Sequence, residues 1–260
     1  MHDTTQFEFP GNSKRKGLGR LIKPSAQGFF GHFALALTAD GTRNPLGLLA
    51  LETVFRLDKS IGHKNWTREK SRGERKRWLN CVEDAEAHIG GRTKAIHVMD
   101  REGDAYALLA GLSEKNYDFV IRSFQDRVLA SHDERLREVA RGARTSLRRE
   151  VSLSPRPRIP GPKGERHPAR RFRVAKLSIA AVAIELPRTS ESGKDRPATI
   201  RLNVIRVSEK TPPVGEPPVE WFLLTNLPID TPGAIAFAVD GYRARGVIEE
   251  FFKALKTGCQ

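Results

Sequence analysis

The first part of the chain consists of β-branched and apolar stretches separated by turn signals, which is typical of β-strands. Residues 1–9 predict a first strand, and two apolar runs at 29–39 and 46–56 are joined by a stretch that contains the turn signal Asp40-Gly41. The two runs predict a hairpin, which together with the first strand makes three antiparallel strands. The Gly- and Lys-rich stretch 11–24 between them predicts a loop.

The apolar positions then change from the spacing of a strand to that of a helix. Residues 70–89 are charged and helix-forming, with apolar residues recurring on one face. A short apolar strand at 94–99, a helix at 105–114 and a strand at 119–123 follow, which predicts a β-α-β unit. Asp100 comes directly after the first strand of this unit, at the end where α/β sheets usually carry their sites.

After residue 123 proline and arginine become frequent, and the pattern is again that of strands. We therefore divide the chain into a first core segment at 1–123, a β-rich basic insertion at 124–218 and a return to the core at 219–260. The predicted fold class is α/β, with a mixed sheet flanked by helices and interrupted by the insertion. The elements expected after residue 123 are a helix at 134–140, strands at 146–152, 169–184, 199–207 and 219–225, a helix at 234–256, and proline-rich connectors at 154–164 and 209–218.

The last helix carries a polar stripe on a mostly apolar circumference. At about 100° per helical residue, Tyr242, Arg245, Glu249 and Lys256 fall within an arc of roughly 60°. The plain alternative is a surface helix with spaced charges. Gly246 lies inside this stretch and is expected to cost about 1 kcal/mol of helix stability, which would loosen the helix near Glu249.

The charge of the chain favours a polyanionic partner. The formal net charge is +14 and the pI is near 10.2. The segment from Arg122 to Lys176 contains sixteen Lys or Arg against six Asp or Glu, a net of +10. Because a guanidinium group matches the geometry of phosphate oxygens, this arginine-rich segment makes nucleic acid the first candidate partner, and a solubilising surface is the alternative.

The remaining composition points to a protein of the cytoplasm. No apolar run reaches the length of a membrane span, and the first residues do not form a signal peptide, so we expect a soluble, intracellular protein. The two cysteines, Cys81 and Cys259, lie far apart without a CxxC partner. This argues against a disulfide framework or a structural zinc site and predicts reduced, incidental thiols.

Three acidic residues occupy positions where a shared metal site could form. Asp3 lies in the first strand, Asp100 follows the strand at 94–99, and Glu249 lies on the last helix. If the first strand neighbours the strand at 94–99, these carboxylates meet, and such a set of hard oxygen ligands suits Mg²⁺ or Mn²⁺ in phosphoryl transfer. The alternative for each aspartate taken singly is a turn or strand-end cap.

These motifs together resemble a known family. The spacing of the polar stripe is Tyr-x2-Arg-x3-Glu-x6-Lys, and it is accompanied by Asp3-Thr4-Thr5, by the segment from Val98 to Asp104, and by the similar segments 119–123 and 221–225 that flank the insertion. The chain is similar over nearly its whole length to the DDE transposases of bacterial insertion sequences that carry this Tyr-Arg-Glu-Lys signature. The resemblance implies a ribonuclease-H-like catalytic core interrupted by a β-rich insertion.

The resemblance also implies the roles of individual residues. Asp3, Asp100 and Glu249 would be the catalytic acids and would bind Mg²⁺, or Mn²⁺, as two ions. Tyr242, Arg245 and Lys256 would contact phosphates of the transposon end. Two further residues, Trp221 and Arg122, would contact the same DNA, Trp221 by stacking on an unpaired base; their alternatives are a core tryptophan and a surface ion pair.

The function implied is metal-dependent cleavage of transposon ends followed by strand transfer into double-stranded target DNA. Members of the family also have an amino-terminal region that recognises transposon ends and a carboxyl-terminal region that pairs two subunits. We therefore expect this chain to be a catalytic-core fragment whose full-length parent forms a homodimer. The alternatives are a truncated, inactive DNA-binding remnant and a host ribonuclease-H-type nuclease, although the spacing of the signature speaks against the nuclease.

Overall fold

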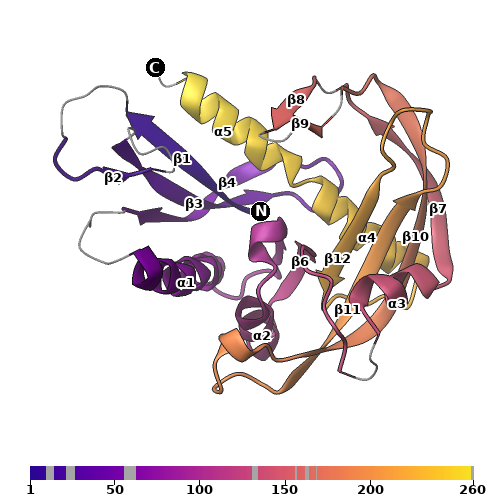
Figure 1. Ribbon diagram of the computed structural model, residues 1–260, viewed down its shortest axis with the longest axis horizontal. Coiled ribbons are helices and arrows are strands. Elements are labelled where there is room, and N and C mark those ends of the chain that lie inside the picture. Colours follow the sequence, from indigo (N-terminus) through magenta and orange to yellow (C-terminus); the bar gives the residue numbers. More distant parts are fainter. Residues whose placement is uncertain are drawn as a thin grey trace.

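The computed structural model shows a mixed α/β molecule in which two β-sheets meet side by side and helices cover them (Figure 1). Within the described residues, no helix is long and apolar enough to cross a lipid bilayer. The structure describes residues 1–9, 15–21, 27–55, 63–130, 134–155, 157–161, 164–167 and 169–258.

The first sheet contains the three antiparallel strands predicted from the sequence. Strand β3 (Gln27–Leu37) pairs with β1 (His2–Phe9) on one side and with β4 (Pro45–Val54) on the other. A short strand, β2 (Gly19–Arg20), also pairs with β3, so the prediction of a loop was wrong at these residues. Part of the predicted loop 11–24 lies outside the described residues.

The second sheet begins with the predicted β-α-β unit. Strands β5 (Ile96–Met99) and β6 (Asp118–Arg122) are parallel and are connected through helix α2 (Tyr106–Glu114). Strand β1 packs beside β5, as expected, although the hydrogen-bonded neighbour of β1 is β3 and that of β5 is β6. This contact joins the two sheets and brings the strand of Asp3 to the strand that ends before Asp100.

The strands of the predicted insertion add to this second sheet. Its order is β5-β6-β12-β11-β10-β7, and every pair except β5 with β6 is antiparallel. The result is a curled mixed sheet of six strands (Figure 1). The added strands are β7 (Thr145–Leu153), β10 (Arg173–Pro187), β11 (Thr199–Glu209) and β12 (Glu220–Thr225).

The other elements of this region are small. The predicted helix at 134–140 is present as α3. The proline-rich connector at 154–164 also contributes residues to a two-stranded ribbon of β8 and β9, which the sequence did not predict. The bounds are α3 (Leu136–Gly142), β8 (Ile159–Gly161), β9 (Gly164–His167) and two 3-10 turns, η1 (Arg101–Gly103) and η2 (Ser190–Ser192).

Burial on both faces explains why the central strands of the second sheet are mostly apolar. Successive side chains of a strand point to opposite faces. Met99 and Ile121 belong to the core under α1 (His63–Ile89) and α2, whereas their neighbours Val98 and Val120 belong to the core under the final helical segment. The position of Asp100 is therefore fixed by a strand that is packed from both sides.

The final helical segment is two helices, and the prediction of one helix over 234–256 was wrong. Helix α4 (Pro232–Arg243) begins with Thr231 as its N-cap, and α5 (Gly246–Gly258) follows it along nearly the same line (Figure 1). Between them the backbone forms i→i−3 hydrogen bonds, from Arg245 N to Tyr242 O at 3.1 Å and from Val247 N to Ala244 O at 3.0 Å. The division falls at Gly246, where a loosened helix was expected.

The two helices cover different sheets. Helix α4 packs on the second sheet through Ile235 and Val239, whereas Ile248 and Phe252 of α5 pack against Phe33 and other apolar residues of the first sheet. The interruption allows one stretch of chain to follow both surfaces. It also places Arg245 at the junction of the two sheets.

A buried acidic residue fixes the start of the insertion. Asp104 accepts hydrogen bonds from the backbone N–H groups of Phe124 and Gln125, at 2.6 and 2.9 Å, and forms an ion pair with Arg127. The side chain of Asp104 is fully buried and that of Arg127 nearly so. Arg127 also donates to the backbone carbonyl of Asp104. The carboxylate therefore ties the turn after η1 to the chain that leaves β6.

We predict that Asp104→Ala destabilises the protein by about 3–5 kcal/mol, because it leaves the Arg127 charge buried without its partner. Urea unfolding at pH 7 measures this loss. The matched control is Glu150→Ala, which removes a carboxylate from an exposed pair with Lys176 and should change stability by less than about 1 kcal/mol. Equal effects of the two substitutions would contradict the role given to Asp104.

Candidate functional site

Asp3 is held in a half-buried position on β1. It lies opposite Phe33 in the register of β1 with β3, and its Oδ1 accepts a hydrogen bond from the N–H of Thr4 at 2.8 Å. Burial raises the pKa of the Asp3 carboxyl, the charge of Arg245 opposes this shift, and the negative charge of Asp100 adds to it. Asp100 follows β5, the strand that packs beside β1.

Asp100 is fixed by the turn that follows β5. Its Oδ1 accepts a hydrogen bond from the N–H of Glu102 at 2.8 Å, so Asp100 is the N-cap of η1. The alternative reading of this residue as a strand-end cap is thus confirmed. The cap does not exclude a functional role, because it uses one oxygen and holds the half-buried carboxylate at the edge of the sheet.

Arg245 connects the first strand with the last helix. Its guanidinium donates to Asp3 Oδ2 at 2.8 Å and to Glu249 Oε1 at 2.8 Å. Burial lowers the pKa of Arg245, but the charges of Asp3, Asp100 and Glu249 raise it by more, so the pKa is above its ordinary value. Two of the acids predicted from the sequence, Asp3 and Glu249, therefore bind one cation.

The carboxylates do not form a closed metal-binding set. A closed site would bring one ligand atom from each of three residues within 4.8 Å of the others. Among the described residues, Asp3, Asp100 and Glu249 do not meet this criterion. Their donor chemistry fits Mg²⁺ or Mn²⁺. However, a cation between Asp3 and Glu249 would need Arg245 to release at least one of them, because the guanidinium lies between these carboxylates.

The other signature residues lie on separate elements. Tyr242 is on α4 and is only 8% exposed, and its ring meets the edge of Trp221 with centroids 5.7 Å apart. Trp221 is half-buried against the core under α4. Lys256 is exposed in the last turn of α5. The predicted common face on one helix is wrong because the chain is divided between α4 and α5.

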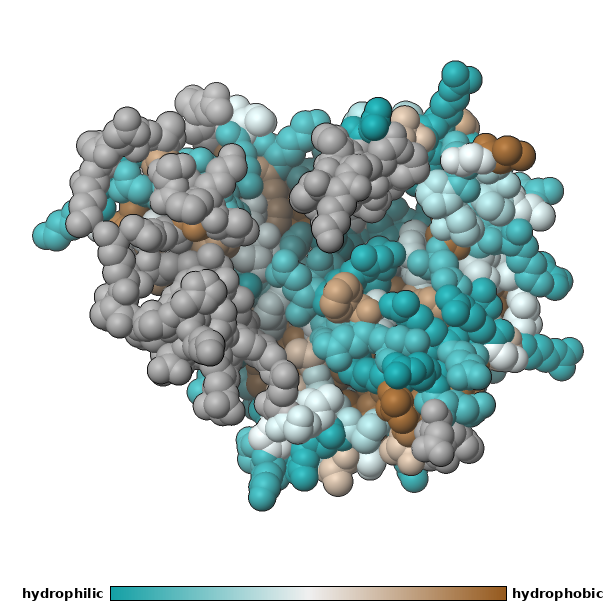
Figure 2. Space-filling view, in the orientation of Figure 1, coloured by the Kyte–Doolittle hydropathy of each residue, from teal (hydrophilic) through white to brown (hydrophobic). Residues whose placement is uncertain are grey.

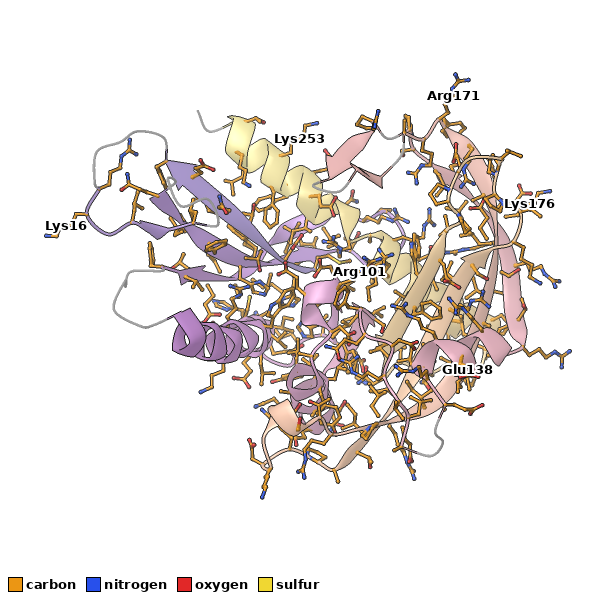
Figure 3. All side chains as sticks on the ribbon, in the orientation of Figure 1. Lys16, Arg101, Glu138, Arg171, Lys176 and Lys253 are labelled. Atoms are coloured by element: carbon orange, nitrogen blue, oxygen red, sulfur yellow. The ribbon has the colours of Figure 1, made fainter. Side chains whose placement is uncertain are left out.

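A group of arginines adjoins Asp100. Burial lowers the pKa of Arg101, and the positive charges of Arg122 and Arg137 lower it further. Figure 3 shows Arg101 near the middle of the molecule, whereas the labelled Arg171 and Lys176 lie at its outer edge. These charges would attract an anionic ligand toward Asp100.

An open pocket of about 750 Å³ lies next to the same residues. Asp100 and Arg101 line one part of it, and Phe124 and Ser190 line another. Arg127, which is paired with Asp104, also contributes to the wall. Of the arginines near Asp100, Arg101 therefore lines a hollow that can admit a ligand.

Several basic residues of the insertion are neutralised by ion pairs with acidic residues of the same chain. Four arginines of the insertion form ion pairs with acids that lie outside the segment from Arg122 to Lys176. Figure 2 shows a mainly hydrophilic surface on the side that carries α3, β7 and β10. The net charge of the segment therefore overstates the charge available to a polyanion. The pairs are Arg127 with Asp104, Arg141 with Glu220, Arg149 with Asp240 and Arg173 with Glu209.

No protein-family model matches this chain. The assignment of the candidate site therefore depends on its own geometry and on the motifs in the sequence.

Two residues of the site were missed by the sequence analysis. Asp104 belongs to the motif that begins at Val98, and an acidic residue four positions after Asp100 could have been noticed as a second fixed carboxylate. Arg137 lies in the insertion far along the chain from Asp100, and no signal in the sequence indicates that the fold brings these residues together.

We predict that the ion pair of Arg245 with Asp3 contributes more to stability than the ion pair of Arg245 with Glu249. The Asp3 and Arg245 side chains are 16% and 15% exposed, whereas Glu249 is 61% exposed and forms an i,i+4 pair. Double-mutant cycles with alanine should give a coupling of about 1–3 kcal/mol for Asp3 with Arg245 and about 0.3–0.5 kcal/mol for Arg245 with Glu249. Urea unfolding provides the energies, and a larger coupling to Glu249 would contradict this description.

Proposed function

We propose that this chain is the catalytic core of a DDE-type transposase, built on a ribonuclease-H-like arrangement and acting on double-stranded DNA. The observation that carries this proposal is that the Arg245 guanidinium binds both Asp3 and Glu249, while Asp100 follows the strand that packs beside β1. These acids come from the first strand, the end of β5 and the last helix, and Asp100 is bordered by arginines.

The fold supports this proposal. Three antiparallel strands are followed by a parallel pair, and the first of these strands packs beside β5. The helix that carries Glu249 covers the first sheet close to Asp3. These elements carry three hard oxygen donors, which suit the divalent metals used in phosphoryl transfer.

The protein would contribute in three ways. Asp3, Asp100 and Glu249 would hold Mg²⁺ or Mn²⁺, and the bound ions would supply the activation of an attacking water or 3′-hydroxyl. Arg101 and Arg122 would bind DNA phosphates next to Asp100. Arg245 would keep the acids together and neutralised before cations and DNA arrive.

An inactive DNA-binding protein is the second candidate. The observation that favours it is the guanidinium of Arg245 between Asp3 and Glu249, because an ion pair that persists there would exclude metal. In this case the arginines around Asp100 would still bind DNA phosphates. The two candidates differ in whether the bound DNA is cut.

We predict that the protein nicks supercoiled DNA in the presence of Mg²⁺ or Mn²⁺, and that Glu249→Gln lowers the rate by about 100-fold or more by removing one metal ligand. Asp100→Asn should do the same, since asparagine preserves the N-cap and removes only the charge. Gel separation of nicked from supercoiled plasmid measures the rate. DNA binding by each variant is measured in parallel.

The matched control is Glu250→Gln, which changes the adjacent exposed carboxylate on α5 and should leave the nicking rate unchanged. Equal nicking by wild type and Glu249→Gln would refute the assignment of Glu249. DNA binding without any metal-dependent nicking by the wild type would favour the inactive DNA-binding protein.

A further inference from the structure

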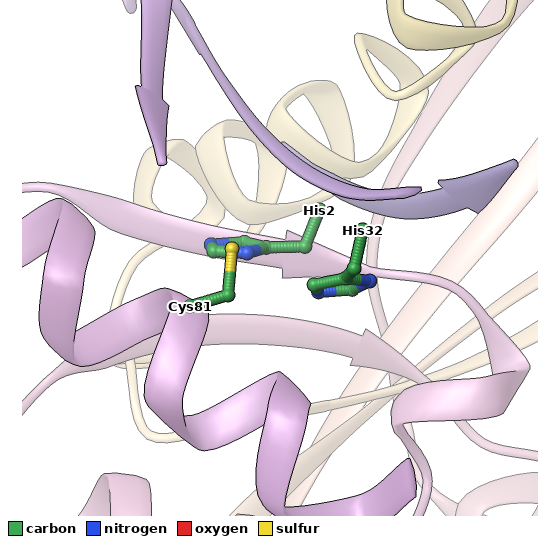
Figure 4. Close-up of side chains that lie close together, drawn as sticks. All are labelled: His2, His32 and Cys81. Atoms are coloured by element: carbon green, nitrogen blue, oxygen red, sulfur yellow. The ribbon is translucent and has the colours of Figure 1, made fainter. Parts of the chain in front are cut away.

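A second group of potential metal ligands lies in the core close to Asp3 and has no part in the proposed function. His2 on β1, His32 on β3 and Cys81 on α1 point toward one another (Figure 4). Their exposed fractions are 1%, 0% and 0%. One ligand atom from each residue lies within 4.8 Å of the others. Buried polar groups normally have hydrogen-bond partners, so this arrangement requires an explanation.

The hydrogen bonds of His2 determine which of its nitrogens is a potential ligand. Glu86 accepts a hydrogen bond from His97 Nε2 at 2.7 Å, and His97 Nδ1 lies 2.8 Å from His2 Nε2. Both rings are buried, with exposed fractions of 1% for His2 and 3% for His97, and a buried site favours the neutral form of an imidazole. His97 Nδ1 is then an acceptor and His2 Nε2 a donor, so His2 Nδ1 carries a lone pair.

His32 shows the same division between its two nitrogens. Its Nδ1 is hydrogen-bonded to the hydroxyl of Thr4 at 2.9 Å, and its ring packs edge-on against Trp78 with centroids 4.3 Å apart. Among the described residues, neither His32 Nε2 nor His2 Nδ1 has a hydrogen-bond partner. Two fully buried imidazole nitrogens are thus left without partners beside a buried thiol.

We propose that His2 Nδ1, His32 Nε2 and Cys81 Sγ form a binding site for one thiophilic metal ion. Metal-binding histidines typically use their other nitrogen for a hydrogen bond that fixes the ring, as Glu86 with His97 does for His2 and Thr4 does for His32. One sulfur and two imidazole ligands suit Cu⁺ and Zn²⁺ and are unsuited to Mg²⁺. The site differs from the acidic site in every ligand.

The charge of the site favours Cu⁺ over Zn²⁺. On binding, the Cys81 S–H bond breaks, the proton passes to solvent and the sulfur electron pair forms the bond to the metal. The thiolate then neutralises a monovalent ion, whereas Zn²⁺ would retain a positive charge in a buried position. Buried Arg77 makes such a charge more costly, because its own charge acts on His32.

The geometry requires a small contraction. Metal bonds of about 2.0–2.3 Å place ligand atoms roughly 3.3–3.8 Å apart, so the side chains would move inward by about 1 Å or less. A bound ion would connect β1, β3 and α1 behind the strand that carries Asp3. The sequence gives no indication of this site, since its three ligands are isolated along the chain.

The test measures metal uptake by the purified chain. After incubation with Cu⁺ kept reduced by ascorbate, or with Zn²⁺, and removal of free metal, elemental analysis should find about one ion per chain. Competition with a chelator should show tighter binding of Cu⁺ than of Zn²⁺. His97→Gln, which removes the support of His2, should weaken binding about 10–100-fold.

Two variants provide matched controls. Cys259→Ser removes the other thiol and His88→Gln an exposed histidine of α1, and both should bind like wild type. Cys81→Ser and His32→Gln should lose stoichiometric uptake. X-ray absorption of copper-loaded Cys259→Ser should show one sulfur and two nitrogen neighbours, a result that does not depend on the folding of a core variant.

Several outcomes would overturn the proposal. The proposal fails if the wild type takes up neither Cu⁺ nor Zn²⁺ stoichiometrically, or if Cys81→Ser takes up as much metal as the wild type. It also fails if the X-ray absorption spectrum shows no sulfur neighbour of the metal. Tighter binding of Zn²⁺ than of Cu⁺ would overturn the choice of ion. None of these results depends on DNA nicking, so this proposal and the transposase proposal can fail separately.

Discussion

The half-buried carboxylate of Asp3 needs a positive charge, and Arg245 supplies it from the other end of the chain. The two residues are 242 positions apart, so their ion pair holds the last helical segment against the first strand. The pair can form because α4 and α5 cover different sheets and leave Arg245 at the junction. The contact of β1 with β5 brings the strand that ends before Asp100 beside the strand of Asp3. The candidate site is therefore a consequence of how two sheets meet.

The same need to compensate charge explains where the arginines of the insertion lie. Several of them are ion-paired with acids of distant strands and helices, such as Arg149 with Asp240 on α4 and Arg173 with Glu209 on β11. The first pair holds the curled sheet to the helix that covers it, and the second joins two neighbouring strands of the sheet. Both use charge that composition alone would assign to DNA. An anionic ligand would meet a smaller group of arginines. Arg101 lines the pocket next to Asp100, and the charge of Arg122 acts on Arg101.

Two polar groups thus lie close together with opposite character. The acids around Arg245 reach the surface and suit hard cations, whereas His2, His32 and Cys81 are fully buried and suit a soft ion. Adjacent residues of β1 supply one ligand to each group, because successive side chains of a strand point to opposite faces. His2 faces the core under α1 and Asp3 faces the junction with α5.

The sequence by itself determined most of the elements, and it predicted Asp3, Asp100 and Glu249 as candidate acids. Alternation and helical spacing depend only on which face of an element is buried, so the hairpin of β3 and β4, the β-α-β unit and the strands of the insertion were predicted close to their observed bounds. These acids could be proposed from the sequence because Asp100 follows a strand end and Glu249 belongs to a regularly spaced signature.

Only the tertiary structure decided how these parts combine. The division at Gly246 results from packing on two sheets, and the pairing of Arg245 with carboxylates results from the burial of Asp3. The cluster of His2, His32 and Cys81 likewise depends on the packing of three elements, which no local pattern contains, because contacts between residues far apart in sequence are set by the whole core.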